Sequence, residues 1–317
     1  MKATTLSRKA PARSSTRSAQ SSTLSIEGRA VPVTHLDKVF YPKAGFTKAD
    51  VIDYYIRISN VLLPHLKDRP LTLKRYPDGV EGGFFYEKRC PAHRPPWVQT
   101  VPIWSENNQA KIHYCMANDL PTIVWAANLG DLELHTSLAR GNASQQPTMM
   151  VFDLDPGQPA NIVDCCQVGL WLRDKLEKLK LKSFAKTSGS KGLQLYVPLN
   201  TKVTYDQTKP LSHQLAQELE REHPDRIISR MEKRLRTGKV FVDWSQNDHF
   251  KTTVCVYSLR AKERPTVSTP VTWDEVETAL KRKSEKNLIF TSKDVLGRVA
   301  EHGDLFEPVL TLKQKIG

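Results

Sequence analysis

The stretch Val151–Gly157, which reads VFDLDPG, constrains the fold more than any other part of this chain. Successive side chains on a strand point to opposite faces, so Phe152 and Leu154 share one face while Asp153 and Asp155 share the other. Two carboxylates on one face repel each other unless a cation lies between them, and oxygen ligands at this spacing suit Mg²⁺ or Mn²⁺ better than zinc. A bare D-x-D pattern also occurs where a strand simply ends in two solvated acids, so its interpretation depends on the residues downstream.

The charge of the chain favours a polyanionic partner. The net charge is +13, and residues 1–25 contain five basic residues and no acid, so the remainder still carries +8. A positive excess that survives removal of the tail is typical of proteins that bind nucleic acid. No apolar run approaches the length of a membrane span, so we expect no contact with a membrane.

The cysteines predict a reducing, cytoplasmic location. Cys165, Cys166 and Cys255, together with Cys90 and Cys115, form no disulfide framework, and nothing resembles a secretion signal. A zinc site could be drawn from Cys90, His93, His113 and Cys115, but this spacing fits no standard zinc finger.

Composition and periodicity divide the chain into a tail and one folded domain. Residues 1–25 are rich in Ser, Ala, Thr and Arg and are predicted to be a disordered basic tail, although organelle transit peptides have a similar composition. Residues 26–310 are predicted to form a single domain of two lobes, about 26–145 and about 146–310, followed by a C-terminal end at 311–317. Strands and helices mix without regular βαβ repetition, which predicts an α+β fold.

Helix signals are clearest where a cap precedes an apolar period. Thr47, with Asp50 three residues later, predicts a helix over 48–66, and Asn118 is expected to cap a second one ending near 128. Further helices are expected over 161–179, 206–222 and 273–283. Strands are expected at 31–34, 71–76, 84–86, 111–116, 132–135, 184–187, 193–199, 239–244 and 252–257.

Two further features suggest phosphoryl chemistry. The turn Ser188–Gly192, SGSKG, joins two predicted strands and offers small residues and a lysine to an anion, although it is not a P-loop. Asp243 ends another apolar strand, so three acids on two strands would suit divalent metal ions. One interpretation is a haloacid-dehalogenase-type phosphohydrolase with Asp153 as nucleophile and Asp155 as acid. It fits poorly, because Gly-Thr should follow the D-x-D pattern and the pattern should lie near the chain start.

The three motifs at 151–157, 186–193 and 241–247 closely resemble those of the archaeo-eukaryotic primase superfamily, specifically the polymerase domain of bacterial DNA ligase D. Residues 34–42, 69–79, 127–135 and 257–260 are also similar, so the resemblance extends from about 26 to 310. It implies a primase-polymerase core, which is an RRM-like mixed sheet with flanking helices, plus an N-terminal α/β lobe.

The resemblance also implies a function and a set of site residues. The expected activity is template-directed nucleotidyl transfer by a stand-alone DNA-dependent RNA/DNA polymerase and primase, which fills gaps at double-strand breaks in non-homologous end joining and often incorporates ribonucleotides. Two Mn²⁺ or Mg²⁺ ions would be held by Asp153, Asp155 and Asp243. The residues expected to contact the incoming nucleotide are Lys74, His135, Ser188, Lys191, Gln194, Arg236, Gln246 and Arg260.

The resemblance implies DNA contacts and partners as well. Lys38 and Lys48 are expected to bind the 5′-phosphate of the downstream strand, and Phe84 and Phe85 to stack at the template, where the alternative is burial in the core. The expected partners are gapped or broken double-stranded DNA with a 5′-phosphate, NTP or dNTP, Ku and a separate DNA ligase. The protein is expected to be a nucleoid-associated monomer.

One residue departs from the family pattern. The second motif of the family continues Lys-Gly-Leu/Met-His, whereas this chain has Gln194 at the histidine position. Glutamine can donate a hydrogen bond to phosphate but carries no charge, so we expect weaker handling of the triphosphate. The competing interpretation is therefore a paralogue that binds DNA ends with weak or no catalysis.

Overall fold

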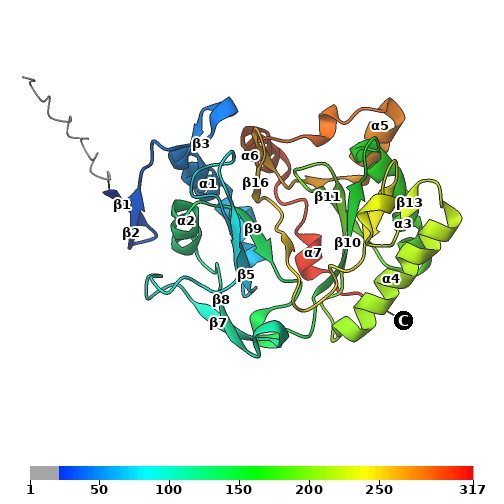
Figure 1. The fold of residues 1–317 in the computed structure, drawn as a ribbon, viewed down its shortest axis with the longest axis horizontal. Coiled ribbons are helices and arrows are strands. Elements are labelled where there is room, and N and C mark those ends of the chain that lie inside the picture. Colours follow the sequence, from blue (N-terminus) through cyan, green and yellow to red (C-terminus); the bar gives the residue numbers. More distant parts are fainter. Residues whose placement is uncertain (1–20, 317) are drawn as a thin grey trace, which may run out of the picture.

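The structure is a computed structural model that describes residues 21–316, and two six-stranded sheets lie side by side in it (Figure 1). One sheet has the order β15-β9-β5-β8-β7, with β6 paired to β5. The other has the order β13-β14-β10-β12-β11-β18, in which only β13 and β14 run parallel. Strands and helices are mixed throughout, which confirms the predicted α+β class.

The first sheet and its helices make up the left-hand part of Figure 1. Buried side chains of α1 and α2 share one apolar core with this sheet. The strands and helices of this part are β1 (Ser21–Ile26), β2 (Arg29–Thr34), β3 (Val39–Tyr41), β4 (Phe46–Thr47), α1 (Lys48–Leu66), β5 (Leu71–Arg75), β6 (Phe85–Glu87), β7 (Thr100–Ser105), β8 (Ala110–Cys115), α2 (Leu120–Asn128), β9 (Asp131–Thr136) and β15 (Thr253–Val254).

The second sheet carries the D-x-D strand at its centre, with α3 and α4 packed against it. The remaining elements are β10 (Met149–Pro156), α3 (Ile162–Lys178), β11 (Phe184–Thr187), β12 (Leu193–Pro198), α4 (Tyr205–Glu222), β13 (Ile227–Ile228), β14 (Val240–Asp243), β16 (Leu259–Ala261), β17 (Pro265–Val267), β18 (Pro270–Val271), α5 (Trp273–Arg282), α6 (Ser292–His302) and α7 (Pro308–Thr311).

The start of α1 follows from its cap. Thr47 accepts a hydrogen bond from the amide of Asp50, and the Asp50 carboxylate accepts one from the Thr47 amide, so two free backbone donors are satisfied. The helix spans Lys48–Leu66 as predicted. The cap predicted for α2 is wrong, because Asp119 and not Asn118 accepts from the amide of Thr122.

Several predicted boundaries need correction. Of the tail predicted at residues 1–25, residues 1–20 lie outside the described residues, but residues 21–25 belong to β1, which pairs along its whole length with β2. The lobes are not contiguous in sequence, because β15 pairs with β9 of the first sheet. The segment after residue 283 contains α6 and α7, and the side chain of Gln314 donates to the Pro198 carbonyl at 2.8 Å, so residues beyond 310 contact the second sheet.

The prediction that no cysteines pair is wrong for one pair. Cys90 and Cys115 form a disulfide across 25 residues, with their Cα atoms 4.9 Å apart. Both thiolates are consumed, so the zinc site drawn with His93 and His113 lacks two of its four ligands. Cys165, Cys166 and Cys255 are free and buried. No helix among residues 21–316 is long and apolar enough to cross a membrane.

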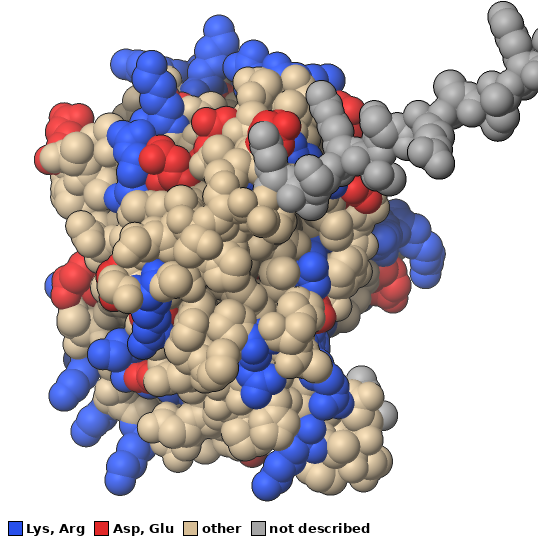
Figure 2. All heavy atoms as spheres, turned by 90° about the vertical axis from the view of Figure 1, so that its left-hand side faces the viewer, with Lys and Arg blue, Asp and Glu red and all other residues tan. Residues whose placement is uncertain are grey.

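The positive charge does not gather into one patch on the face shown in Figure 2. Lys and Arg side chains concentrate toward the upper and lower edges of this face, and uncharged residues occupy much of the area between them. A polyanion would therefore find few cations at the middle of this face.

Candidate active site

The D-x-D strand places two carboxylates in a cavity of about 410 Å³. Phe152 and Leu154 are fully buried on the helical side of β10, so Asp153 and Asp155 lie on the other side and line the cavity. Asp243 on β14 is the direct cross-strand partner of Asp153. The alternation predicted from the sequence is therefore present, and the three acids lie on adjacent strands.

Two of the three carboxyl groups, those of Asp153 and Asp155, have a raised pKa. Burial and the charges of Asp155 and Asp243 raise the pKa of Asp153, while burial and the charge of Asp243 raise the pKa of Asp155. The Oδ1 atom of Asp153 is buried without a hydrogen-bond partner. This donor set fits Mg²⁺ or Mn²⁺. Within residues 21–316 no three His, Cys, Asp or Glu side chains are grouped closely enough to hold an ion as they stand.

Asp243 is oriented by the residues that follow it. Its Oδ1 accepts hydrogen bonds from the amide and hydroxyl of Ser245, at 2.9 and 2.6 Å, and its Oδ2 accepts from Gln246 Nε2 at 2.8 Å. Gln246 lines the cavity, whereas Asp243 does not. Gln246 is thus placed where it can hold the third acid and face a ligand at the same time.

The turn between β11 and β12 forms another part of the cavity wall. Ser188 Oγ accepts from the amides of Ser190 and Gly192, at 3.2 and 3.1 Å, which closes the turn on itself. A Cβ on Gly192 would lie 2.3 Å from the carbonyl oxygen of Leu154, so only glycine allows the turn to approach β10 this closely. Ser188, Ser190 and Lys191 line the cavity.

Gln194 is on β12, between two neighbouring strands. It pairs with Asp153 on β10 and with Lys186 on β11. Lys186 is fully buried, and its Nζ donates to Gln194 Oε1 at 2.5 Å, to Ser268 Oγ at 2.7 Å and to the Val254 carbonyl at 3.2 Å. Burial lowers the pKa of Lys186 to about 7. Hydrogen bonding from Gln194 holds the pKa of Asp153 below the value that burial and the neighbouring acids would otherwise give it.

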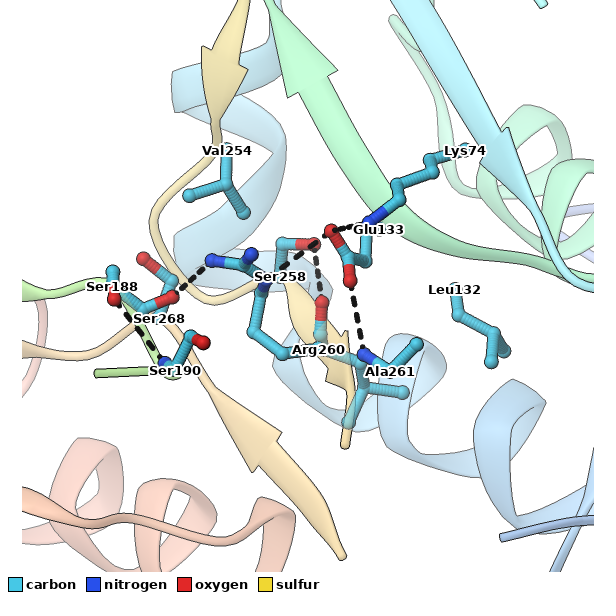
Figure 3. A network of polar contacts seen from close by, with 12 residues as sticks. Lys74, Leu132, Glu133, Ser188, Ser190, Val254, Ser258, Arg260, Ala261 and Ser268 are labelled. Atoms are coloured by element: carbon cyan, nitrogen blue, oxygen red, sulfur yellow. Dashed lines mark hydrogen bonds and ion pairs between the residues drawn. The ribbon is translucent and has the colours of Figure 1, made fainter. Parts of the chain in front are cut away.

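The opposite wall of the cavity belongs to the first sheet. Lys74 on β5, His135 on β9 and Arg260 on β16 converge on Glu133, a buried carboxylate that our sequence analysis did not identify (Figure 3). His135 and Arg260 line the cavity, whereas Lys74 does not, and β16 belongs to a separate two-stranded sheet with β17. A signal was present, because Glu133 lies two residues before His135 and so shares its face of the strand. Lys186 was likewise not singled out as a site residue, and no pattern marks its burial.

Arg236 lies outside the cavity lining. Its guanidinium stacks 3.7 Å from the ring centroid of Phe241, and its Nη2 donates to the Met231 carbonyl at 2.8 Å. A Cβ on Gly157 would overlap the Arg236 carbonyl, so the turn after β10 and this loop are in close contact. The charge of Arg236 lowers the pKa of Asp155, although burial and Asp243 outweigh it.

The predicted DNA-contacting residues lie outside the cavity as well. Lys48 Nζ donates to the Thr34 carbonyl at 2.7 Å, and Lys38 pairs with Asp78 at 2.7 Å. Burial and the charge of Lys38 lower the pKa of Lys48 to about 8, so the two ammonium groups are close enough to repel each other.

The two predicted stacking residues are at the surface and not in the core. Phe84 and Phe85 are 54% and 44% exposed, which leaves their rings open to a base. Lys74 Nζ lies 4.6 Å from the ring centroid of Phe84, so this ring borders the cluster around Glu133. Arg75 lies 5.1 Å from the ring centroid of Phe85.

Comparison with known proteins gives consistent matches over most of the chain. Residues 47–306 match the family model described as LigD, primase-polymerase domain. The multifunctional non-homologous end joining protein LigD of Mycolicibacterium smegmatis is 40% identical over 281 residues, which cover 88% of this chain and 36% of that protein. The bifunctional LigD of Bacillus subtilis is 32% identical over 85% of this chain and 42% of its own length. The chain therefore spans well under half of these relatives.

A solved structure covers nearly the same extent. The polymerase domain of Mycobacterium tuberculosis ligase D, in complex with DNA, superimposes with a TM-score of 0.81 at 37% sequence identity. The match covers 89% of this chain and 98% of that domain.

Proposed function

Because the chain belongs to the family of LigD primase-polymerase domains, we propose that it is a template-directed nucleotidyltransferase that fills gaps at DNA double-strand breaks in non-homologous end joining. One observation carries the proposal. Asp153 and Asp155 face a cavity that is also lined by the Ser188–Gly192 turn of the same sheet, by His135 of the first sheet and by Arg260. Such a cavity can receive a polyphosphate between cationic donors and a metal-binding carboxylate group.

We propose that Asp153, Asp155 and Asp243 hold two divalent ions, Mn²⁺ or Mg²⁺. Bound there, the ions would activate the 3′-hydroxyl of the primer and stabilise the charge on the leaving pyrophosphate. Gln246 keeps Asp243 in place through the bond from its side-chain amide to Oδ2. Gln194 does the same for Asp153 from the neighbouring strand.

The remaining side chains of the cavity bind and orient the nucleotide. Arg260 and Lys191 supply positive charge to the triphosphate from the cavity lining, and Lys74 supplies it from beside the lining, next to Glu133. Ser188 and His135 supply neutral hydrogen-bond donors. Gln194 contributes an uncharged donor in place of the family's histidine. Arg236 lies outside the cavity, next to the turn that follows β10. Its positive charge favours the ionised form of Asp155.

The proposal extends to DNA and to partners. The substrate is gapped or broken double-stranded DNA whose 5′-phosphate binds Lys38 and Lys48, with the template base stacked on Phe84 and Phe85 and with NTP or dNTP as the incoming nucleotide. Ku and a separate DNA ligase would act with this protein to complete the repair. The enzyme itself would be a monomer, located in the cytoplasm and associated with the nucleoid. The DNA-bound relative and the exposure of both phenylalanines support this arrangement.

A primer-extension assay on gapped DNA tests the proposal. The protein should add a templated nucleotide when supplied with NTP or dNTP and Mn²⁺ or Mg²⁺, and Asp155→Ala should abolish addition while DNA binding persists, since contacts elsewhere supply most of the affinity. Binding of DNA ends without extension in any combination would favour the idle paralogue. Release of inorganic phosphate without template would favour the phosphohydrolase.

A further inference from the structure

Glu133 is a buried carboxylate with one oxygen fixed by the fold. The residue is 1% exposed and lies in the middle of β9. Its Oε1 accepts a hydrogen bond from the Ala261 amide at 3.1 Å and lies 3.4 Å from the hydroxyl of Tyr76. Ala261 belongs to β16, so this oxygen joins two strands and sets the direction of the carboxylate.

The other oxygen, Oε2, lies at the convergence of three side chains predicted to bind the nucleotide. Lys74 Nζ is 3.2 Å away, His135 Nε2 is 3.1 Å away and Arg260 Nε is 3.2 Å away. Figure 3 shows Glu133 between Lys74 and Arg260. Arg260 is also held at its other end, because its Nη1 donates to the carbonyl of Ser188. One carboxylate oxygen thus connects the first sheet with the phosphate-binding turn.

The charges of this cluster are well defined. Burial lowers the pKa of His135, so at neutral pH it is an uncharged donor to Glu133. Burial would raise the pKa of Glu133, but the hydrogen bond from His135 and the charges of Arg260 and Lys74 hold it well below its usual range. At neutral pH the cluster of Lys74, His135, Arg260 and Glu133 therefore contains two cations and one anion.

We propose that Glu133 is a positioning residue, which holds Lys74, His135 and Arg260 in the arrangement that receives the triphosphate and in doing so weakens triphosphate binding. The inference rests on the proposed function. The cause of the weakening is competition, since Glu133 is an anion within 3.2 Å of a nitrogen of each of the three side chains that would bind the substrate. In return, the three side chains are already correctly oriented for the triphosphate, because Glu133 fixes them before the nucleotide binds.

The proposal predicts opposite effects on binding and turnover for Glu133→Gln, which keeps the shape and removes the charge. Inorganic tripolyphosphate should bind more tightly, by about threefold or more, because a repelling charge is removed from a site of low dielectric constant. The kcat of nucleotide addition should fall by about tenfold or more, because a misplacement near 1 Å costs up to about 100-fold. A residue that only supports the fold would weaken both or change neither.

The experiment combines calorimetry and kinetics on the full chain. Binding of tripolyphosphate is measured in EDTA, so no metal ion enters that readout, and single-nucleotide addition to gapped DNA gives kcat. Glu87→Gln is the matched control, because Glu87 pairs with Arg75 at 2.8 Å on the same sheet and neither residue lines the cavity. This control should leave both quantities unchanged.

A second variant keeps the proposal testable if the first does not fold. Glu133→Asp retains the charge but is one methylene shorter, so tripolyphosphate affinity should stay near that of the native protein while kcat falls. Unchanged kcat in a folded variant, or parallel loss of binding and turnover in Glu133→Gln, would overturn the role of Glu133 without touching the proposed function. A native protein that neither binds tripolyphosphate nor extends a primer would instead overturn the proposed function.

Discussion

Replacing Asp153 by Asn should stabilise the metal-free protein, although it should destroy the proposed activity. Asp153 is repelled by both of the other acids. Burial is the largest cause of its raised pKa, and the charges of Asp155 and Asp243 raise the pKa further. Its Oδ1 has no hydrogen-bond partner, so the substitution breaks no bond at that atom. Asparagine has the same shape and removes one of the three charges.

The size of the effect follows from the register. Asp153 and Asp243 are direct antiparallel partners, and such residues have Cα atoms about 4.5–5.5 Å apart. Two unit charges about 5 Å apart repel by roughly 3 kcal/mol at an effective dielectric constant of 20. The Asp153 carboxylate reaches the water of the cavity, so we reduce this to about 1–2 kcal/mol of unfolding free energy, which is roughly 2–6 °C in Tm.

The assay is thermal unfolding in EDTA as a function of pH. The folded state raises the pKa of Asp153 above its unfolded value of about 3.9, so the folded protein keeps a proton that the unfolded chain loses. Stability therefore falls as pH rises from about 4 through the raised pKa, and Asp153→Asn removes this loss. The two proteins should unfold together near pH 4 and diverge toward pH 7.5.

Metal ions provide the second arm of this test. Mn²⁺ should raise the Tm of the native protein by binding the folded state alone, and should raise that of the Asn variant much less. If the variant is less stable than the native protein in EDTA at pH 7.5, or if the difference is the same at pH 4, the argument from carboxylate repulsion is refuted.

Three further predictions concern single side chains. If Gln194→His raises kcat/KM above that of the native protein, this increase should become smaller as pH falls below about 6.5. The reason is that a protonated imidazole would face the ammonium group of Lys186. An increase in kcat/KM that grows at acid pH would contradict this. The preference for a 5′-phosphate over a 5′-hydroxyl, measured by binding of gapped DNA, should decline as pH rises through 8, because burial and Lys38 lower the pKa of Lys48 to about 8; equal preference at pH 7 and 9 would rule out this role for Lys48. Phe84→Ala should leave stability within about 0.5 kcal/mol and weaken template binding, measured by fluorescence anisotropy, by roughly 1–3 kcal/mol; a large drop in Tm would instead indicate a core residue.

Local rules explain what the sequence could predict here. The cap at Thr47 and the alternation along β10 depend on neighbours within a few residues, and the helix and the two faces of the strand follow from them. The spacing of acids also predicted which side of β10 would carry charge. Family resemblance then supplied Lys74, His135 and Arg260, which the structure brings together around one carboxylate.

The parts that could not be predicted depend on pairing between distant segments. Nothing near Lys186 indicates that its nitrogen meets Ser268, which lies 82 residues away. The pairing of β15 with the first sheet and the bond between Cys90 and Cys115 are long-range in the same sense. The order of Ser21–Ile26 was missed because its polar composition resembles a tail, whereas the backbone of β2 provides it with a partner.

The site's dependence on distant segments also determines when during folding it forms. The bond from the Ala261 amide to Glu133 closes a separation of 128 residues, and contacts of that span form after local ones. Asp153 and Asp243 pair across 90 residues, so the carboxylates of β10 and β14 should likewise come together only near the native state, on the native side of the transition state. Relief of their repulsion, by an ion or by Asp153→Asn, should lengthen the lifetime of the folded protein by slowing unfolding, while the rate of refolding stays the same.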